Sequence, residues 1–161
     1  MGTSTFSGPV VATNGMYAGS GSLVTVDSAT ATAAPADHAG RTVLLDRAAG
    51  IAVTLPAAAG TGHTYKFIVL TTITSNSTTI KVASASDTMT GVAIVANDTD
   101  NSASIFEAGA TADTITFNGS TTMGIKGDIV ELQDIASGLW SVKVTGSATG
   151  TEATPFSATV S

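Results

Sequence analysis

Residues 51–70 constrain the fold of this chain more than any other stretch. They read IAVTLPAAAGTGHTYKFIVL, two runs of β-branched and aromatic residues separated by a proline, a string of alanines and two glycines. Alternating apolar residues interrupted by Pro and Gly predict two β-strands joined by a short loop. Elsewhere in the chain, the 3.6-residue periodicity of a long amphipathic helix is missing. The sequence therefore predicts an all-β protein.

The same strand pattern recurs through the middle of the chain. Nine strands are expected, at residues 41–46, 51–55, 63–72, 77–83, 91–96, 103–107, 113–117, 128–134 and 139–145. Short strands at this spacing predict a jelly-roll-like β-sandwich, and the absence of a fixed repeat speaks against a solenoid. In the last strand Trp140, Val142 and Val144 alternate with polar residues, so we expect them to face the core. Asn118-Gly119 is the strongest hairpin-turn signal in the chain.

Composition divides the chain into three zones. Residues 1–38 mix isolated hydrophobic residues with the low-complexity run SATATAAPADHAG, which predicts an extended N-terminal arm and linker. Residues 39–146 are the expected sandwich body. Residues 147–161 are expected to form a C-terminal tail with one apolar anchor around Phe156.

Charge and hydropathy limit the partners of the protein. Only 11% of the residues are charged, the net charge is −6, and the six basic residues are scattered, so we expect no nucleic-acid binding. The mean hydropathy of +0.34 is high for a soluble monomer, which predicts that some apolar surface is buried in an oligomer. No run has the length of a membrane span or the character of a secretory signal, so no membrane association is expected. With no cysteine, the chain has neither disulfides nor thiolate metal ligands.

Few residues offer catalytic chemistry. The two histidines are His38, in the low-complexity run, and His63, which we expect at the edge of a turn. Residues 60–63 are glycine-rich but lack the Lys-Ser/Thr of a phosphate-binding loop, and a turn between strands is expected there. We therefore predict that the protein is not an enzyme and holds no cofactor.

Two groups of acidic residues were considered as sites. Residues 97–101, NDTDN, place Asp98 and Asp100 where a hard cation could bind, but a polar loop is the simpler interpretation and a weak cation site stays open. Asp128 and Asp134 are expected on one face of a strand and Glu131 on the other. We expect these three to be solvated acids at strand edges rather than a glycosidase pair.

Several segments resemble a known group of proteins. The turn LPAAAGTG before a Tyr-Lys-Phe strand, the later DTITFNGSTTMGIKGDIVEL and the SGLWSV run resemble tailed-bacteriophage virion proteins, chiefly capsid decoration or cement proteins and head fibres. The N-terminal STFSGPVVATNGM is similar to the arm that such proteins carry, and the resemblance covers roughly residues 3–144. It implies a non-enzymatic homotrimer on the capsid exterior that binds the major capsid protein. The expected capsid-binding residues of the arm are Phe6, Pro9, Val10, Val11, Met16 and Tyr17.

A second class of virion protein stays open. A trimeric head-fibre or tail-fibre receptor-binding module would need a sugar pocket, for which Trp140 or Tyr65 could supply the stacking ring. One Trp and two Tyr are few for such a surface, and the alternation around Trp140 favours a core position. A hydrolase has the least support, because no acid-base pair stands out.

Overall fold

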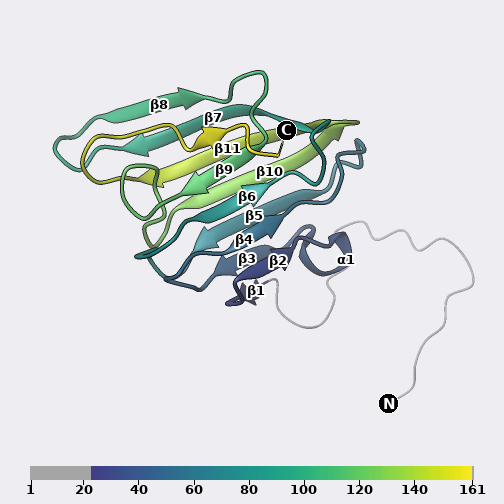
Figure 1. Cartoon of the computed structure of the whole chain (residues 1–161), viewed down its shortest axis with the longest axis horizontal. Coiled ribbons are helices and arrows are strands. Elements are labelled where there is room, and N and C mark those ends of the chain that lie inside the picture. The colour runs from purple at the N-terminus through teal and green to yellow at the C-terminus, as the bar shows by residue number, and fades with distance from the viewer. Residues whose placement is uncertain (1–22, 161) are drawn as a thin grey trace, which may run out of the picture.

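The computed structural model describes residues 23–160, and its regular structure is almost entirely β (Figure 1). Within this range the chain forms twelve strands and one short helix. These are β1 (Leu23–Val26), β2 (Thr30–Thr32), α1 (Pro35–His38), β3 (Thr42–Leu45), β4 (Ala52–Thr54), β5 (Thr64–Val69), β6 (Thr78–Lys81), β7 (Thr88–Ala96), β8 (Ala103–Glu107), β9 (Thr114–Phe117), β10 (Ile129–Ala136), β11 (Leu139–Ser147) and β12 (Phe156–Ser157).

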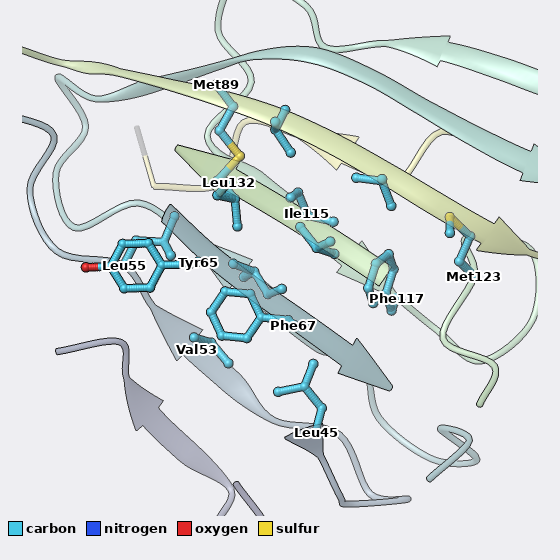
Figure 2. Packing of buried hydrophobic residues seen from close by; sticks show 14 of the residues in the cluster. Leu45, Val53, Leu55, Tyr65, Phe67, Met89, Ile115, Phe117, Met123 and Leu132 are labelled. Atoms are coloured by element: carbon cyan, nitrogen blue, oxygen red, sulfur yellow. The ribbon is translucent and has the colours of Figure 1, made fainter. Parts of the chain in front are cut away.

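The strands form two sheets that pack face to face. Sheet A has seven strands in the order β1-β3-β5-β10-β11-β7-β8, and sheet B has five in the order β12-β9-β6-β4-β2. One cluster of buried hydrophobic residues fills the space between them. Figure 2 shows side chains of this cluster, among them Tyr65 and Phe67 from sheet A and Val53 and Phe117 from sheet B. The predicted all-β sandwich is therefore confirmed.

Strand pairing is mixed. The first six strands alternate between the sheets, so that β1, β3 and β5 lie side by side and parallel in sheet A while β2, β4 and β6 do the same in sheet B. Five of the ten strand pairings in the described range are parallel, unlike the antiparallel pairing of a jelly roll. The first half thus winds like a short solenoid. Thr42 pairs with Leu23 of the preceding coil and with Lys66 of the following coil, and these two separations along the chain are unequal. The coils therefore differ in length, and the sequence carries no fixed period.

The nine predicted strands are confirmed, but the predicted zone boundaries need correction. Residues 23–38 contain β1, β2 and α1, and Val26 and Ala33 are buried in the common core, so the described end of the expected arm belongs to the sandwich. Most of the expected C-terminal tail is also integrated, because Phe156 is buried and β12 pairs with β9. These strands have two to four residues, too few for an alternating pattern to stand out.

Asn118-Gly119 forms a turn but not a hairpin. The flanking strands β9 and β10 lie in different sheets, so the loop crosses the sandwich instead of joining two paired strands. Gly119 has φ +78° and donates its N–H to Met123 O at 2.7 Å. The turn at Asn118-Gly119 is present, but the predicted hairpin is wrong, because strand pairing depends on contacts distant in sequence.

Candidate interaction surface

The arm residues predicted to bind the capsid, Phe6, Pro9, Val10, Val11, Met16 and Tyr17, precede the described range. Within residues 23–160, the structure does place the candidate catalytic and metal-binding side chains. His63 is exposed immediately before β5, and Nδ1 of His38, the last residue of α1, lies 3.2 Å from the O atom of Ala34, the residue before α1. Over the same residues, no cluster of three or more His, Cys, Asp and Glu is placed to hold a metal ion. None of the described helical structure is long and apolar enough to cross a membrane.

Asp134, at the inner face of β10, organises the loop between β4 and β5. Its carboxylate accepts hydrogen bonds from the N–H groups of Ala59 (3.1 Å), Gly60 (2.7 Å) and Thr61 (3.0 Å) and from the Thr61 hydroxyl (2.7 Å). Burial opposes the ionisation of Asp134, but the hydrogen bonds from the Thr61 hydroxyl and the three amides outweigh it and lower the pKa to about 2. This carboxylate therefore holds the LPAAAGTG loop in place, and its lone pairs are occupied.

Three further buried aspartates also accept hydrogen bonds from backbone N–H groups. Asp128 accepts the N–H groups of Gly124, Ile125 and Ser147 at 2.7–3.0 Å, and burial outweighs these bonds and raises its pKa. Asp87 accepts the N–H of Ala58 at 3.1 Å. Asp113 accepts the N–H groups of Thr159 and Val160 at 2.8 and 3.1 Å. Each buried carboxylate satisfies loop amides that would otherwise be unpaired inside the protein.

This finding corrects one expectation and confirms another. Asp128 and Asp134 are buried, not solvated, because loops fold over both ends of β10 and present their amides to them. The predicted face assignment is confirmed, since Glu131 is exposed on the opposite face of the same strand. Hydrogen bonds to the backbone outweigh the cost of burying the Asp134 carboxylate and offset part of that cost for Asp128, a role that local sequence patterns do not reveal.

The two aspartates of the NDTDN loop between β7 and β8 accept hydrogen bonds from backbone N–H groups. Asp98 accepts the N–H of Gly150 at 3.2 Å, and Asp100 accepts the N–H of Ser102 at 2.9 Å. Hydrogen bonds from the Ser102 side chain and backbone lower the pKa of Asp100. These bonds are those of a polar turn.

The outer face of sheet A carries a row of alternating charges. Thr42, Lys66, Glu131 and Lys143 stand directly opposite one another on β3, β5, β10 and β11. Lys66 Nζ lies 3.4 Å from Glu131 Oε1, and the two side chains are 41% and 49% exposed. An exposed ion pair contributes about 0.2–1 kcal/mol to stability. The Lys66–Glu131 pair therefore contributes little to the stability of the fold.

An apolar row runs beside the charge row on the same face. Two residues away from the charge row on each strand, the side chains point to the same face and stand opposite one another across the sheet. They are Leu44, Ile68, Ile129, Ile94 and Ile105 on β3, β5, β10, β7 and β8. The first four are half-buried, and Ile105 is 69% exposed. On β11 the row is interrupted by Thr145. We call the charge row and the apolar row together the outer face of sheet A.

A shallow groove of about 460 Å³ lies over the charge row. Its lining includes Arg41, Thr64, Lys66, Glu131, Gln133 and Lys143. Arg41, Lys66 and Lys143 are half of the basic residues of a chain with a net charge of −6. The sequence showed them as scattered, because their proximity depends on a strand order that brings β3, β5, β10 and β11 together.

Comparisons with known proteins give no relatives for this chain: no family model, no curated protein and no solved structure matches it.

Proposed function

We propose that this protein is a structural virion protein that binds the outer surface of a phage capsid as a homotrimeric decoration or cement protein and stabilises the shell. The observation that carries the proposal is the outer face of sheet A, where an apolar row lies beside a row of alternating charges. Apolar contact area supplies affinity, and a patterned charge row fixes register and excludes wrong partners. The segment similarity described above supplies the identity of the partner, the major capsid protein.

A non-enzymatic role agrees with how the acids are used. Asp87, Asp113, Asp128 and Asp134, the buried carboxylates of the described chain, all accept hydrogen bonds from loop backbone. Catalytic acids usually face a cleft with room for a substrate. Here Asp87, Asp128 and Asp134 hold loops that join the two sheets, and Asp113 holds the segment after β12. A rigid body with a broad contact face suits a protein that must fit repeated sites on a shell.

The repeated geometry of a capsid favours weak contacts in large number. Three outer faces on one trimer, together with capsid-contacting residues of the three N-terminal arms such as Phe6, would engage neighbouring capsid subunits at once. Linked contacts raise the overall affinity without any single tight contact. Bridging several subunits stabilises the shell because the bound state requires all of them in place.

The receptor-binding alternative loses the pocket on which it depended. Trp140 is 0% exposed and Tyr65 is 1% exposed, so neither ring can stack on a sugar. The described residues therefore favour the decoration role over a glycan-binding module built on these two rings.

Co-sedimentation with capsids assembled from the major capsid protein tests the proposal. Ile68→Glu puts a carboxylate into the apolar row, and Lys143→Glu reverses one charge of the charge row. Each should weaken capsid binding about tenfold or more, the equivalent of about 1.4 kcal/mol. Lys81→Glu, a matched charge reversal on β6 of sheet B, should bind as the unmodified protein does. Binding that is equal for all three variants, or no binding by the unmodified protein, would contradict the proposal.

A further inference from the structure

Strand β8 presents an open edge of sheet A. It is the last strand of that sheet in the described range and pairs only with β7. Asn97 N–H bonds to Ser102 O at 3.1 Å, and Ala108 N–H bonds to Gly91 O at 2.9 Å. In an antiparallel ladder every second residue bonds to the neighbouring strand, so the backbone groups of the intervening Ala103, Ile105 and Glu107 point away from β7.

This edge has only one of the usual protections against pairing with another chain, the charged Glu107 at its end. Its sequence is Ala-Ser-Ile-Phe-Glu, with no lysine, proline or bulge. Ile105, at 69%, is more exposed than the other large hydrophobic residues of the described chain. Natural sheet edges normally carry such protection, because unpaired N–H and C=O groups form a template for an additional strand.

Sheet B also stops short beneath β8. The inward-facing Ser104 and Phe106 of β8 are only half-buried, whereas the inward-facing Ala93 and Val95 of β7 are fully buried. Figure 1 shows β8 at the margin of the molecule, beyond the short strand β12. A groove of about 260 Å³ lies here, lined by residues that include Glu107, Ala112, Phe156 and Ser157. The Ser157 hydroxyl in its wall is buried and has no hydrogen-bond partner among the described residues.

We propose that β8 accepts residues 10–13 of a second copy of this chain as an additional strand of sheet A. This inference rests on the homotrimer of the proposed function. Residues 1–22 contain no charged side chain, so the added strand would bring no charge of its own to β8, where Glu107 is the one charged residue. Within them Val10-Val11-Ala12-Thr13 is a β-branched run between Gly8-Pro9 and Asn14-Gly15, the composition of a short strand between turns.

Chain reach favours a second copy over the same copy. The N-terminal segment joins the described chain at Leu23 in β1, the opposite edge strand of sheet A from β8. Six strand spacings of about 4.8 Å place the two edges about 29 Å apart. Residues 14–22, fully extended, span at most about 32 Å, so they would have to run almost straight across their own sheet. If the β8 strand of a neighbouring copy lies beside this β1, residues 14–22 have a much shorter distance to span.

The resulting contact is head-to-tail. The β1 edge of each copy supplies the strand and the β8 edge of the next copy receives it, a heterologous interface that closes into a ring of three. This assigns Val10 and Val11, expected from sequence to contact the capsid, to the interface within the trimer. Phe6, which precedes them, is left available for the capsid.

The oligomeric state of the purified protein tests the inference. Light scattering after size exclusion should give a trimer for the unmodified chain. It should give a monomer for the deletion of residues 1–22, for Val10→Asp/Val11→Asp and for Ile105→Lys. Two matched controls should stay trimeric. Thr3→Asp/Ser4→Asp adds the same charge outside residues 10–13, and Ile135→Lys changes an isoleucine that is 45% exposed and lies on β10, away from the β8 edge.

Amide hydrogen exchange provides the second measurement. In the trimer the N–H groups of Ala103, Ile105 and Glu107 should be protected, and the deletion of residues 1–22 should raise their exchange rates at least tenfold while the β10 amides keep theirs. A trimer that persists after the deletion, or a monomeric unmodified protein, overturns the inference. Failure of the capsid role appears separately, as a trimer that does not co-sediment with capsids.

Discussion

The rings of Tyr65 and Trp140 meet edge to face at the inner surface of sheet A, with their centroids 5.7 Å apart and their planes at 67°. Trp140 also stands opposite Asp134 and Met89 in the register of β10 and β7. The Tyr65 hydroxyl and the Trp140 indole nitrogen are both buried without a hydrogen-bond partner among the described residues. The pair therefore contributes through packing, not through polar contacts.

Trp140→Ala should leave a large cavity. Trp140 heads the fully buried side chains of the core by volume, and truncating such a residue costs about 3–5 kcal/mol of unfolding free energy. That is a large fraction of the stability of an ordinary domain. Chemical denaturation measures the loss, with Ile135→Ala, at a position on β10 that is 45% exposed and lies away from the β8 edge, as a control that should change stability by less than about 0.5 kcal/mol. A Trp140→Ala protein as stable as the control would exclude the core role.

Tyr65→Phe should cost almost nothing. Burial, and next the negative charge of Asp134, raise the pKa of Tyr65, so the hydroxyl stays protonated. Because that hydroxyl has no partner, its removal takes a desolvated polar group out of the core. We expect an unfolding free energy unchanged or raised by up to about 1 kcal/mol. A loss above that size in denaturant unfolding would mean that the hydroxyl makes a bond in solution.

Asp134→Asn should make the protein less sensitive to acid. The pKa of about 2 lies below the usual 3.8 of an aspartate, so the folded state favours the ionised form. The stabilisation is complete above about pH 4 and is lost as the pH falls through 2. The variant should be less stable than the unmodified protein at pH 7, and the difference should shrink between about pH 4 and pH 2.

Asp128→Asn is the matched comparison, because the pKa of Asp128 is raised. Its contribution is greatest at low pH and is lost as the pH rises through the folded pKa. The stability deficits of the two variants should therefore change in opposite directions as the pH falls. Urea unfolding at several pH values measures both, and deficits that move in the same direction would refute the assignment.

Gly119→Ala should destabilise the protein more than Gly150→Ala. The two glycines have nearly the same φ, +78° and +75°, so the backbone strain of an added side chain is similar. A Cβ at Gly119 would lie 1.8 Å from Ile73 O, whereas nothing lies within 4 Å at Gly150. Strain alone costs about 1–2 kcal/mol, and the clash adds to it at Gly119 only. Equal melting temperatures for the two variants would contradict the packing of this loop against Ile73.

Strand positions could be read from the sequence because they depend on local alternation. The alternation of Trp140, Val142 and Val144 with polar residues predicted the inner face of β11, and the structure confirms it. Strand order could not be read, because it depends on contacts between distant segments. The parallel winding of β1 to β6 could not be predicted, because the sequence carries no repeat of fixed period. Likewise, nothing near Asp134 in the sequence indicates that its partners are Ala59, Gly60 and Thr61.

The candidate surface was hidden for the same reason. Lys66, Glu131 and Lys143 are far apart in the chain, and only the register of β5, β10 and β11 brings them into one row. The corrected boundary also decides which truncation can test the arm. A deletion of most of the expected arm and linker, through residue 37, would remove β1 and β2 of the sandwich, so the informative truncation ends at residue 22.

The proposed capsid role is tested most directly by cryo-EM of the particle in which this chain occurs. The account predicts trimeric density on the outside of the capsid shell, with Ile68 and Lys143 on the outer face of sheet A turned toward the major capsid protein. Density for this chain at the tail tip, or on the shell with sheet A turned away from the capsid, would contradict it.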